Sequence, residues 1–401
     1  MSARGNRGRK PAPRARRIPA RTTAALLACA VAATACAAGP AATHQARPTA
    51  RPANPTGVAL PQIPASRREH VPSALYGTML YGPAPPGLPR LPRPLVNLAD
   101  IMPGGPPPDG IPAIDRPRFL RPAQVHFLSA SEPVLALQIG ADAPAYPVQI
   151  LIWHEIVNDT VGGVPVTITY CPLCNTAIAY DRRAAGRVLS FGTSGLLYDS
   201  NLLMYDRQTQ SLWVQFTGQA VAGVLIRHQL RSYPIQTVSW GAWRAGHPHG
   251  WVLSRDTGYT RPYGFNPYPG YDNIHSPPFL FSGRVNGRYA AKTSLVGIRY
   301  RGAAVAVLLT TLRRRRVIDL TIAGGADVGA TGAFSPVVGG RRLHFRPAAG
   351  GFRDRETGSH WSVLGHADAG PLTGQNLTPV PHVDTFWFVW AAFRLHTRVI
   401  S

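Results

Sequence analysis

The chain has 401 residues, of which 45% are hydrophobic, so it is long enough for two domains that each bury a core. Its formal net charge is +23, which is common in proteins that bind nucleic acid. However, the basic residues are almost all Arg, with Lys only at Lys10 and Lys292, and no basic block is interleaved with aromatic residues. We therefore expect no nucleic-acid binding. The 40 Gly and 40 Pro argue for many turns and against long helices.

The N-terminus has the pattern of an export signal. Residues 1–21 contain eight basic residues and no acid, and residues 22–35 form an uncharged segment rich in Ala and Leu that is too short to span a bilayer. This predicts an export signal over residues 1–35. The junction ATAC, which ends at Cys36, resembles a loose bacterial lipobox. We therefore expect export to the cell membrane or cell surface, with a lipid anchor on Cys36; simple secretion and an uncleaved anchor are the alternatives.

Residues 36–124 are rich in Pro, with Ala, Arg and Gly between, and show little periodicity. Such a composition cannot bury enough apolar surface to order itself. We expect a disordered spacer at the start of this stretch and an extended segment, without secondary structure, at its end.

Alternating polar and apolar residues begin near Val125 and continue almost to the C-terminus. A period of two is typical of β-strands, so the sequence predicts a mainly β fold with few short helices. A hairpin is expected around Gly140, followed by a strand or short helix that ends at His154 and Glu155. The best short helix elsewhere covers residues 237–245.

Two stretches of the chain resemble each other. Residues 206–243 and 354–390 both contain DRxTxSxW, then AxAG, then WxxW, in the same order and at nearly the same spacing. This predicts a tandem duplication. The first β-rich repeat covers residues 125–256, a connector rich in Tyr, Pro and Gly covers 257–292, and a second, degenerate repeat without cysteine covers 293–401.

Residues shared by both repeats are best explained by the common fold, because the repeat without thiols keeps them. A structural turn and core role is therefore predicted for Asp206, Arg207, Thr209, Ser211, Trp213, Trp240 and Trp243. Residues found only in the first repeat are the better site candidates.

Cys171 and Cys174 lie at the end of a predicted strand, residues 166–170, and are the only cysteines after Cys36. At CxxC spacing, two sulfurs can bind one metal ion or close a small, reducible disulfide. A purely structural disulfide would close too short a loop to stabilise the fold much. A redox-active dithiol and a metal site therefore remain as alternatives, and the absence of a second CxxC excludes a four-thiolate zinc site.

Neighbouring first-repeat residues could complete either kind of site. His154 or Glu155 could act as a base beside the thiols, or His154 could be the third ligand, with Cys171 and Cys174, of a transition metal such as zinc, copper or iron. Supporting roles are expected for Asn158, Asp159, Tyr198 and Met204. Met204 would be a ligand only for a soft ion such as copper.

Three segments carry a resemblance to a known family: WHEIVNDTVGGVPVTITYCPLCNTAIAYDR, SGLLYDSNLLMYDRQTQSLWVQFTG and TFWFVWAAF. They resemble the bacterial and archaeal domain-of-unknown-function family numbered 3179, over the chain from about residue 133 to 397. Some members of that family resemble selenoproteins, with selenocysteine in the cysteine motif. The resemblance thus implies nucleophilic or redox work at Cys171 or Cys174.

The sequence leaves three hypotheses. The first is a thiol-dependent oxidoreductase, in which one cysteine attacks and the other resolves, with an unidentified redox partner. The second is a metal-binding module or metalloenzyme that uses Cys171, Cys174 and His154 and receives its metal from a donor. The third is a non-catalytic protein of the cell envelope that acts through interactions.

Overall fold

The computed structural model describes residues 73–77, 82–84, 86–87, 90–300, 303–320, 326–329 and 332–401, all within one compact unit that covers residues 48–401. The predicted export signal, the lipidation site Cys36 and the first part of the Pro-rich spacer lie outside the described residues. Within the described ranges, no helix combines the length and the apolar character needed to cross a bilayer.

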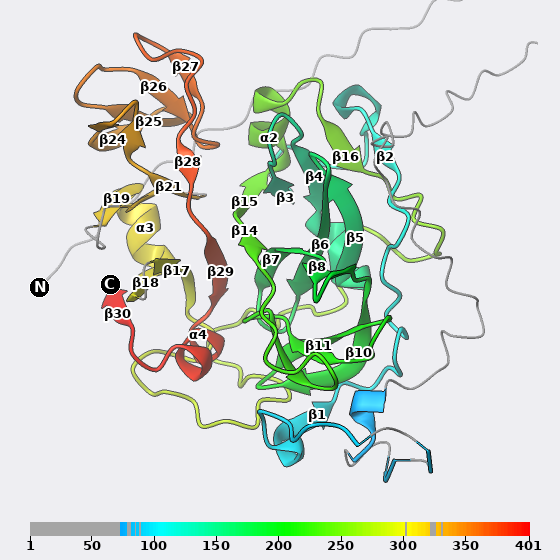
Figure 1. Ribbon diagram of the computed structural model, residues 1–401. Helices are drawn as coiled ribbons and strands as arrows, with labels where there is room; N and C mark the ends of the chain where they lie inside the picture. The colour runs from blue at the N-terminus through cyan, green and yellow to red at the C-terminus, as the bar shows by residue number, and fades with distance from the viewer. Residues whose placement is uncertain are drawn as a thin grey trace, which may run out of the picture. The chain divides into compact units, whose positions relative to one another are not determined.

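The fold is mainly β with few short helices, which confirms the prediction from the alternating pattern (Figure 1). The α-helices of the described residues are seven residues long: α1 (Val148–His154), α2 (Trp240–Gly246), α3 (Leu309–Arg315) and α4 (Trp387–Phe393). The helix expected over 237–245 begins later, because residues up to Ser239 form a strand and the Ser239 hydroxyl then caps α2 by accepting a hydrogen bond from the Ala242 amide.

Three sheets form the first part of the folded chain. In spatial order, the first contains β1 (Ile101–Pro103), β10 (Phe191–Tyr198), β11 (Asn201–Asp206), β12 (Leu212–Val214) and β13 (Gln219–Ala222). The second contains β14 (Ser232–Tyr233), β7 (Thr176–Asp181), β6 (Val164–Cys171) and β5 (Ile156–Val161). The third contains β15 (Ile235–Ser239), β3 (Pro133–Leu137), β4 (Pro144–Pro147), β16 (Trp251–Leu253) and β2 (Phe119–Leu120), and a small ribbon pairs β8 (Arg183–Ala184) with β9 (Arg187–Val188).

The described residues of the second part of the chain also form small sheets, of four strands each. One contains β29 (His382–Phe386), β17 (Ser294–Tyr300), β18 (Ala303–Leu308) and β30 (Arg398–Ile400). Another contains β19 (Val317–Leu320), β20 (Ala326–Gly329), β21 (Ala333–Ser335) and β28 (Thr378–Pro379). The third contains β24 (Phe345–Ala348), β25 (Gly351–Asp354), β26 (His360–Ser362) and β27 (Ala367–Ala369), and a ribbon pairs β22 (Val337–Val338) with β23 (Arg341–Arg342).

The order of elements is repeated along the chain. The order β15-β3-β4-β16 and the order β29-β17-β18-β30 both consist of two antiparallel pairings followed by a parallel one. Along the chain, α1 follows β4 as α3 follows β18. Likewise, β16 follows α2 as β30 follows α4. This correspondence is what a duplication would produce, but the duplication itself stays a prediction.

The end of the Pro-rich stretch is bound to the folded part more firmly than expected. Its residues 101–103 form β1 and pair with β10, although no secondary structure was expected there. Arg207 forms ion pairs with Asp109 at 2.9 Å and with Asp115 at 3.0 Å. Sequence patterns missed these elements because a short edge strand anchored by distant partners has no periodicity of its own.

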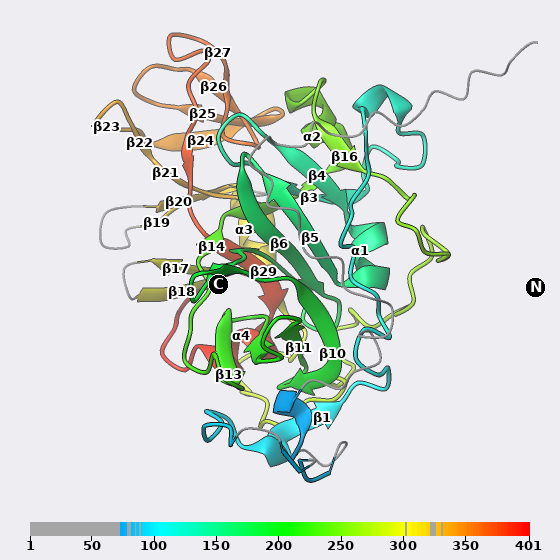
Figure 2. The same cartoon turned by 45° about the vertical axis from the view of Figure 1, so that its right-hand side comes forward.

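The core is continuous between the two repeats around the thiols. One apolar cluster contains Cys171 and Cys174 from the first repeat together with Trp387 and Trp390 from the second. Strand β29 contacts both β7 and β15, as can be followed in Figures 1 and 2. The thiol region is thus built by segments from both predicted repeats.

Candidate functional site

The two cysteines flank a tight turn at the end of β6. The amide of Cys174 donates a hydrogen bond of 3.2 Å to the carbonyl oxygen of Cys171, which closes a four-residue turn. Such a turn holds its end Cα atoms within about 7 Å, close to the separation that a disulfide needs. Both thiols are free and buried, with 1% of Cys171 and none of Cys174 exposed.

Both sulfurs face one main-chain oxygen. The Cys171 Sγ lies 3.7 Å and the Cys174 Sγ 3.2 Å from the carbonyl oxygen of Ser200. Ser200 and Asp199 form the two-residue turn that joins β10 to β11, with φ angles of 61° and 50°. These left-handed conformations cost free energy in residues other than glycine, and such strain concentrates at functional sites. The turn between β10 and β11, which lies between the predicted supporting residues Tyr198 and Met204, therefore contributes to the site.

A buried polar network continues from Cys174. The Asn201 amide donates to the Cys174 Sγ at 3.4 Å and to the Gln215 Oε1 at 2.8 Å. Gln215 in turn donates to the Thr169 hydroxyl at 2.9 Å and accepts from the Thr176 hydroxyl at 3.1 Å. A fully satisfied network of this kind fixes side-chain positions in the core. Asn201 and Gln215 were not among the predicted site residues, although Asn201 lies between Tyr198 and Met204. Gln215 lies two residues after Trp213, where the predicted second repeat has Val363.

The second repeat and the connector cover the thiols. The carbonyl oxygen of Cys174 accepts hydrogen bonds from the Thr385 hydroxyl at 3.1 Å and from the Phe386 amide at 3.2 Å. On the connector, the Phe279 carbonyl accepts a hydrogen bond from the Ser200 hydroxyl, and its amide donates to the Tyr271 hydroxyl at 3.2 Å. The thiols are therefore enclosed by segments distant in sequence.

Lys292 holds the connector in place. Its ammonium donates hydrogen bonds to the Tyr271 carbonyl at 2.6 Å and the Ser276 hydroxyl at 2.7 Å, and it lies 3.5 Å from the centre of the Tyr271 ring. The side chain is 1% exposed, and desolvation lowers its pKa. Since a buried cation is costly unless it is well bonded, these contacts stabilise the closed connector.

Glu155 is a buried carboxyl that no described residue hydrogen-bonds through its side chain. Burial raises its pKa to about 8. It is the residue that ends α1, with a left-handed φ of 57°, and its amide donates to the Leu151 carbonyl at 2.7 Å. The Tyr268 hydroxyl is close enough to both groups to feel their charge: burial raises its pKa, and Glu155 and Cys171 raise it further. A buried, protonated carboxyl without partners is a candidate proton donor.

His154 is held by groups other than the thiols. Its Nδ1 lies 2.7 Å from the Pro112 carbonyl and its Nε2 lies 2.6 Å from the Tyr263 hydroxyl. Burial lowers its pKa to about 4, so the ring is neutral at pH 7. Because both ring nitrogens are engaged, this arrangement leaves none to accept a proton from a thiol or to bind a metal ion.

The predicted supporting residues have separate roles. Asn158 exchanges hydrogen bonds with the main chain of Phe191, and Asp159 accepts one from the Tyr146 hydroxyl at 2.6 Å. Met204 is fully buried in the core, and Tyr198 packs edge-on against Phe393 of α4.

Within the described residues, His, Cys, Asp and Glu side chains form no group of three or more that could hold a metal ion. The proposed ligands Cys171, Cys174 and His154 are therefore not assembled as a three-ligand site. Burial raises the pKa of the Cys174 thiol, and the neighbouring Cys171 raises it further. The geometry thus favours a protonated Cys174 thiol, close to the thiol of Cys171.

Comparison with known proteins bears on this arrangement. A family model described as "Protein of unknown function (DUF3179)" matches residues 108–397. The chain belongs to this family. The DUF3179 match begins upstream of the region in which we noted the resemblance and includes Asp109 and Asp115, which tie the extended segment to Arg207. No curated protein and no solved structure matches the chain.

Proposed function

We propose that this DUF3179 protein is a thiol oxidoreductase whose Cys171 and Cys174 alternate between a dithiol and a disulfide. The observation that supports this most is the convergence of both sulfurs on the Ser200 carbonyl, at 3.7 and 3.2 Å, across a hydrogen-bonded four-residue turn. Two thiols held in this way can form a bond with little movement of the backbone.

The residues around the two thiols favour a reversible redox reaction over a structural disulfide. A disulfide across four residues removes little entropy from the unfolded chain, so it would stabilise the protein weakly. In contrast, left-handed residues, a satisfied polar network and the buried carboxyl of Glu155 are all costly features placed around the pair. Proteins retain such features where chemistry needs them.

The proposed reaction is exchange with a disulfide of another molecule, which requires local opening of the segments that cover the buried thiols. The Cys171 thiolate attacks one sulfur of that disulfide, whose S–S bond breaks and releases one thiol, and a mixed disulfide forms. The Cys174 thiolate then attacks the Cys171 sulfur and releases the second thiol. Two electrons and two protons pass to the partner, and an intramolecular disulfide remains. Cys174 is assigned the resolving role because burial raises its pKa.

Glu155 has a role in moving protons. With a pKa of about 8 it carries a proton at pH 7, and both Glu155 and Cys171 act electrostatically on the hydroxyl of Tyr268. It can therefore donate a proton toward the departing thiolate, and take one up again as its carboxylate.

The test is trapping of the mixed disulfide on the purified protein from residue 48 onward. With a small aromatic disulfide as oxidant, Cys174→Ser should accumulate a mixed disulfide, and Cys171→Ser should not. Wild type should lose both free thiols and reach an intramolecular disulfide, with a midpoint measurable in thiol and disulfide buffers. Circular dichroism checks that each variant is folded.

Two outcomes would oppose the proposal. If both thiols of the folded wild-type protein stay reduced at every potential tested, the cysteines have no redox function and only a structural role. Stoichiometric binding of Cu(I) or Zn(II), lost in Cys171→Ser and protecting both thiols from oxidation, would support a metal-binding function with the thiols as ligands.

We also propose that the protein acts outside the cytoplasm. The basic N-terminus, the short apolar segment and Cys36 support export with a lipid anchor. In that compartment a protein disulfide is available as the co-reactant.

A further inference from the structure

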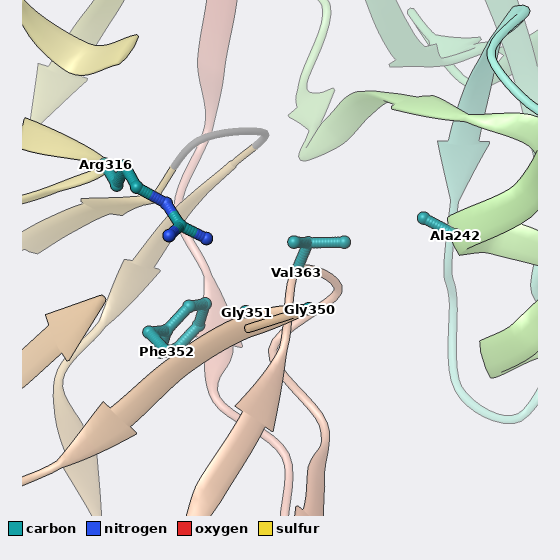
Figure 3. Close-up of a pocket in the computed structure, with 6 residues that line it drawn as sticks. All are labelled: Ala242, Arg316, Gly350, Gly351, Phe352 and Val363. Carbon is teal, nitrogen blue, oxygen red and sulfur yellow. The ribbon is translucent and has the colours of Figure 1, made fainter. Parts of the chain in front are cut away.

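The second repeat contains a pocket of about 220 Å³ at a distance from the thiols in sequence (Figure 3). Its lining comes from the end of α3, the hairpin of β24 and β25, the residue after β26 and one residue of α2: Arg316, Gly350, Gly351, Phe352, Val363 and Ala242. For scale, an engineered cavity of about 150 Å³ holds benzene. The pocket is therefore large enough for a small organic molecule.

Two residues that line the pocket correspond, in the predicted second repeat, to residues near the thiols in the first. Arg316 ends α3 as Glu155 ends α1: the φ angles are 63° and 57°, and their amides donate to the Leu312 and Leu151 carbonyls. Val363 follows Trp361 by two residues, as Gln215 follows Trp213.

The correspondence extends to the strand that carries the shared Asp. Phe352 precedes Asp354 by two residues, as Met204 precedes Asp206. In the second repeat, then, an Arg stands in place of the buried carboxyl, and an apolar side chain stands in place of the glutamine of the polar network.

Arg316 has unused hydrogen-bond donors. One guanidinium nitrogen donates to the Ala348 carbonyl at 2.8 Å, which places the group above the β24–β25 hairpin. In Figure 3 the guanidinium points toward the space between Phe352 and Val363. Among the described residues, no acidic side chain forms an ion pair with Arg316 or with Arg313, Arg314 or Arg315 before it. Arg316 is exposed, and its positive charge at the pocket has no acidic partner within the described part of the chain.

Two glycines at the tip of the β24–β25 hairpin line the pocket. Gly350 has a φ of 73°, which favours glycine, and a Cβ on Gly351 would collide with the Trp361 carbonyl oxygen across the β25–β26 pairing. The hairpin thus leaves room beside the Phe352 ring and the Val363 side chain, which supply apolar walls.

We propose that this pocket binds a small anion with an apolar body, held by its carboxylate or phosphate group on Arg316. The planar guanidinium matches either group in a two-pronged hydrogen bond, and the apolar part of the ligand packs on Phe352 and Val363. The second repeat is then a ligand-binding unit with its own chemistry. This inference is independent of the redox function.

The probes are benzoate and phenyl phosphate, with neutral benzamide as the matched analogue, measured by calorimetry on the protein from residue 48 onward. Benzoate or phenyl phosphate should bind with one site, and benzamide should bind at least about tenfold more weakly, as expected when a charged hydrogen bond is lost. The anion that binds more tightly shows whether the ligand of this pocket carries a carboxylate or a phosphate ester.

Two variants test the location. Arg316→Gln should weaken anion binding by about tenfold or more, whereas Arg314→Gln, which removes an exposed charge that does not line the pocket, should change it less than about twofold. Val363→Phe fills the pocket and should also abolish binding. Equal losses in both Arg variants, equal binding of benzamide, or saturable binding that survives Val363→Phe would each overturn the proposal. Thermal unfolding confirms that the variants are folded.

Discussion

The hydroxyl of Thr385 donates a hydrogen bond of 3.1 Å to the carbonyl oxygen of Cys174, although 211 positions separate the two residues in the chain. The Phe386 amide donates to the same oxygen at 3.2 Å. Strand β29 of the second repeat therefore fixes the turn that holds the thiols of the first. The cysteine-free repeat is in this respect a part of the site.

Loss of the Thr385 contact should loosen the thiol turn. Thr385→Val removes one donor to a buried carbonyl and should lower the free energy of unfolding by about 1 kcal/mol. It should also speed alkylation of Cys171 and Cys174, because local opening becomes easier. Thr167→Val is the matched control, since the buried Thr167 hydroxyl has no hydrogen-bond partner. Urea unfolding and timed alkylation measure both effects. If the two variants have the same free energy of unfolding and the same alkylation rate, the Thr385 hydrogen bond does not hold the thiol turn.

The two DRxTxSxW turns should make similar contributions to the free energy of unfolding. In each, the Trp Nε1 donates to the Asp carboxylate at 2.9 Å, Trp213 to Asp206 and Trp361 to Asp354. The Thr amide three residues after each Asp also donates to it, at 2.6 Å. Asp206→Ala and Asp354→Ala should each cost about 1–3 kcal/mol by leaving buried donors unpaired. A large cost in one repeat and none in the other, by urea unfolding, would count against the duplication as the source of both turns.

The sequence predicted the strand content and the shared turns because these depend on local patterns. Alternation at period two identified the β-rich fold, and the comparison of residues 206–243 with 354–390 pointed to Trp213, which is fully buried. It also marked Cys171 and Cys174 as a pair. These features are readable since each is encoded within a few neighbouring residues.

The surroundings of the thiols were not predictable in the same way. Thr385, Lys292 and Tyr268 approach the site from the second repeat and the connector, and no local pattern marks them as partners of a CxxC turn. His154 was a reasonable candidate by proximity in sequence. Its two nitrogens, however, are engaged by Pro112 and Tyr263, which only the three-dimensional fold brings near it.

The predicted lipid anchor on Cys36 has to be tested on the full-length precursor, because the protein from residue 48 onward lacks this cysteine. Cys36→Ser should abolish lipidation of the full-length precursor and move the exported protein from the detergent phase to the aqueous phase in a partitioning assay. Cys29→Ser is the control, because Cys29 lies in the apolar segment of the predicted signal and should leave with it. A Cys36→Ser protein that still partitions into detergent would exclude the anchor.

Glu155 should make the protein less stable as the pH rises. Its folded-state pKa is about 8, raised by burial from 4.5, so between these values the folded chain binds a proton that the unfolded chain has released. The free energy of unfolding should therefore fall with rising pH across this window, by at most about 1.4 kcal/mol per pH unit, and level off above pH 8. His154 has the opposite sign, because burial lowers its pKa to about 4 from 6.5, and it offsets Glu155 below pH 6.5.

The clearest window for the measurement is therefore about pH 7 to 8, above the unfolded-state pKa of His154, where its ring is mostly neutral in both states. Urea unfolding of the reduced protein should show a decline in wild type that is absent in Glu155→Gln, which keeps the shape of the side chain without its titration. Glu132→Gln, a change at a carboxyl that accepts a hydrogen bond from Gln149 at 2.6 Å, serves as the control and should keep the wild-type slope. If Glu155→Gln and wild type have the same pH profile, the carboxyl is ionised at pH 7 in the folded protein, and the role of Glu155 as a proton donor to the thiols is wrong.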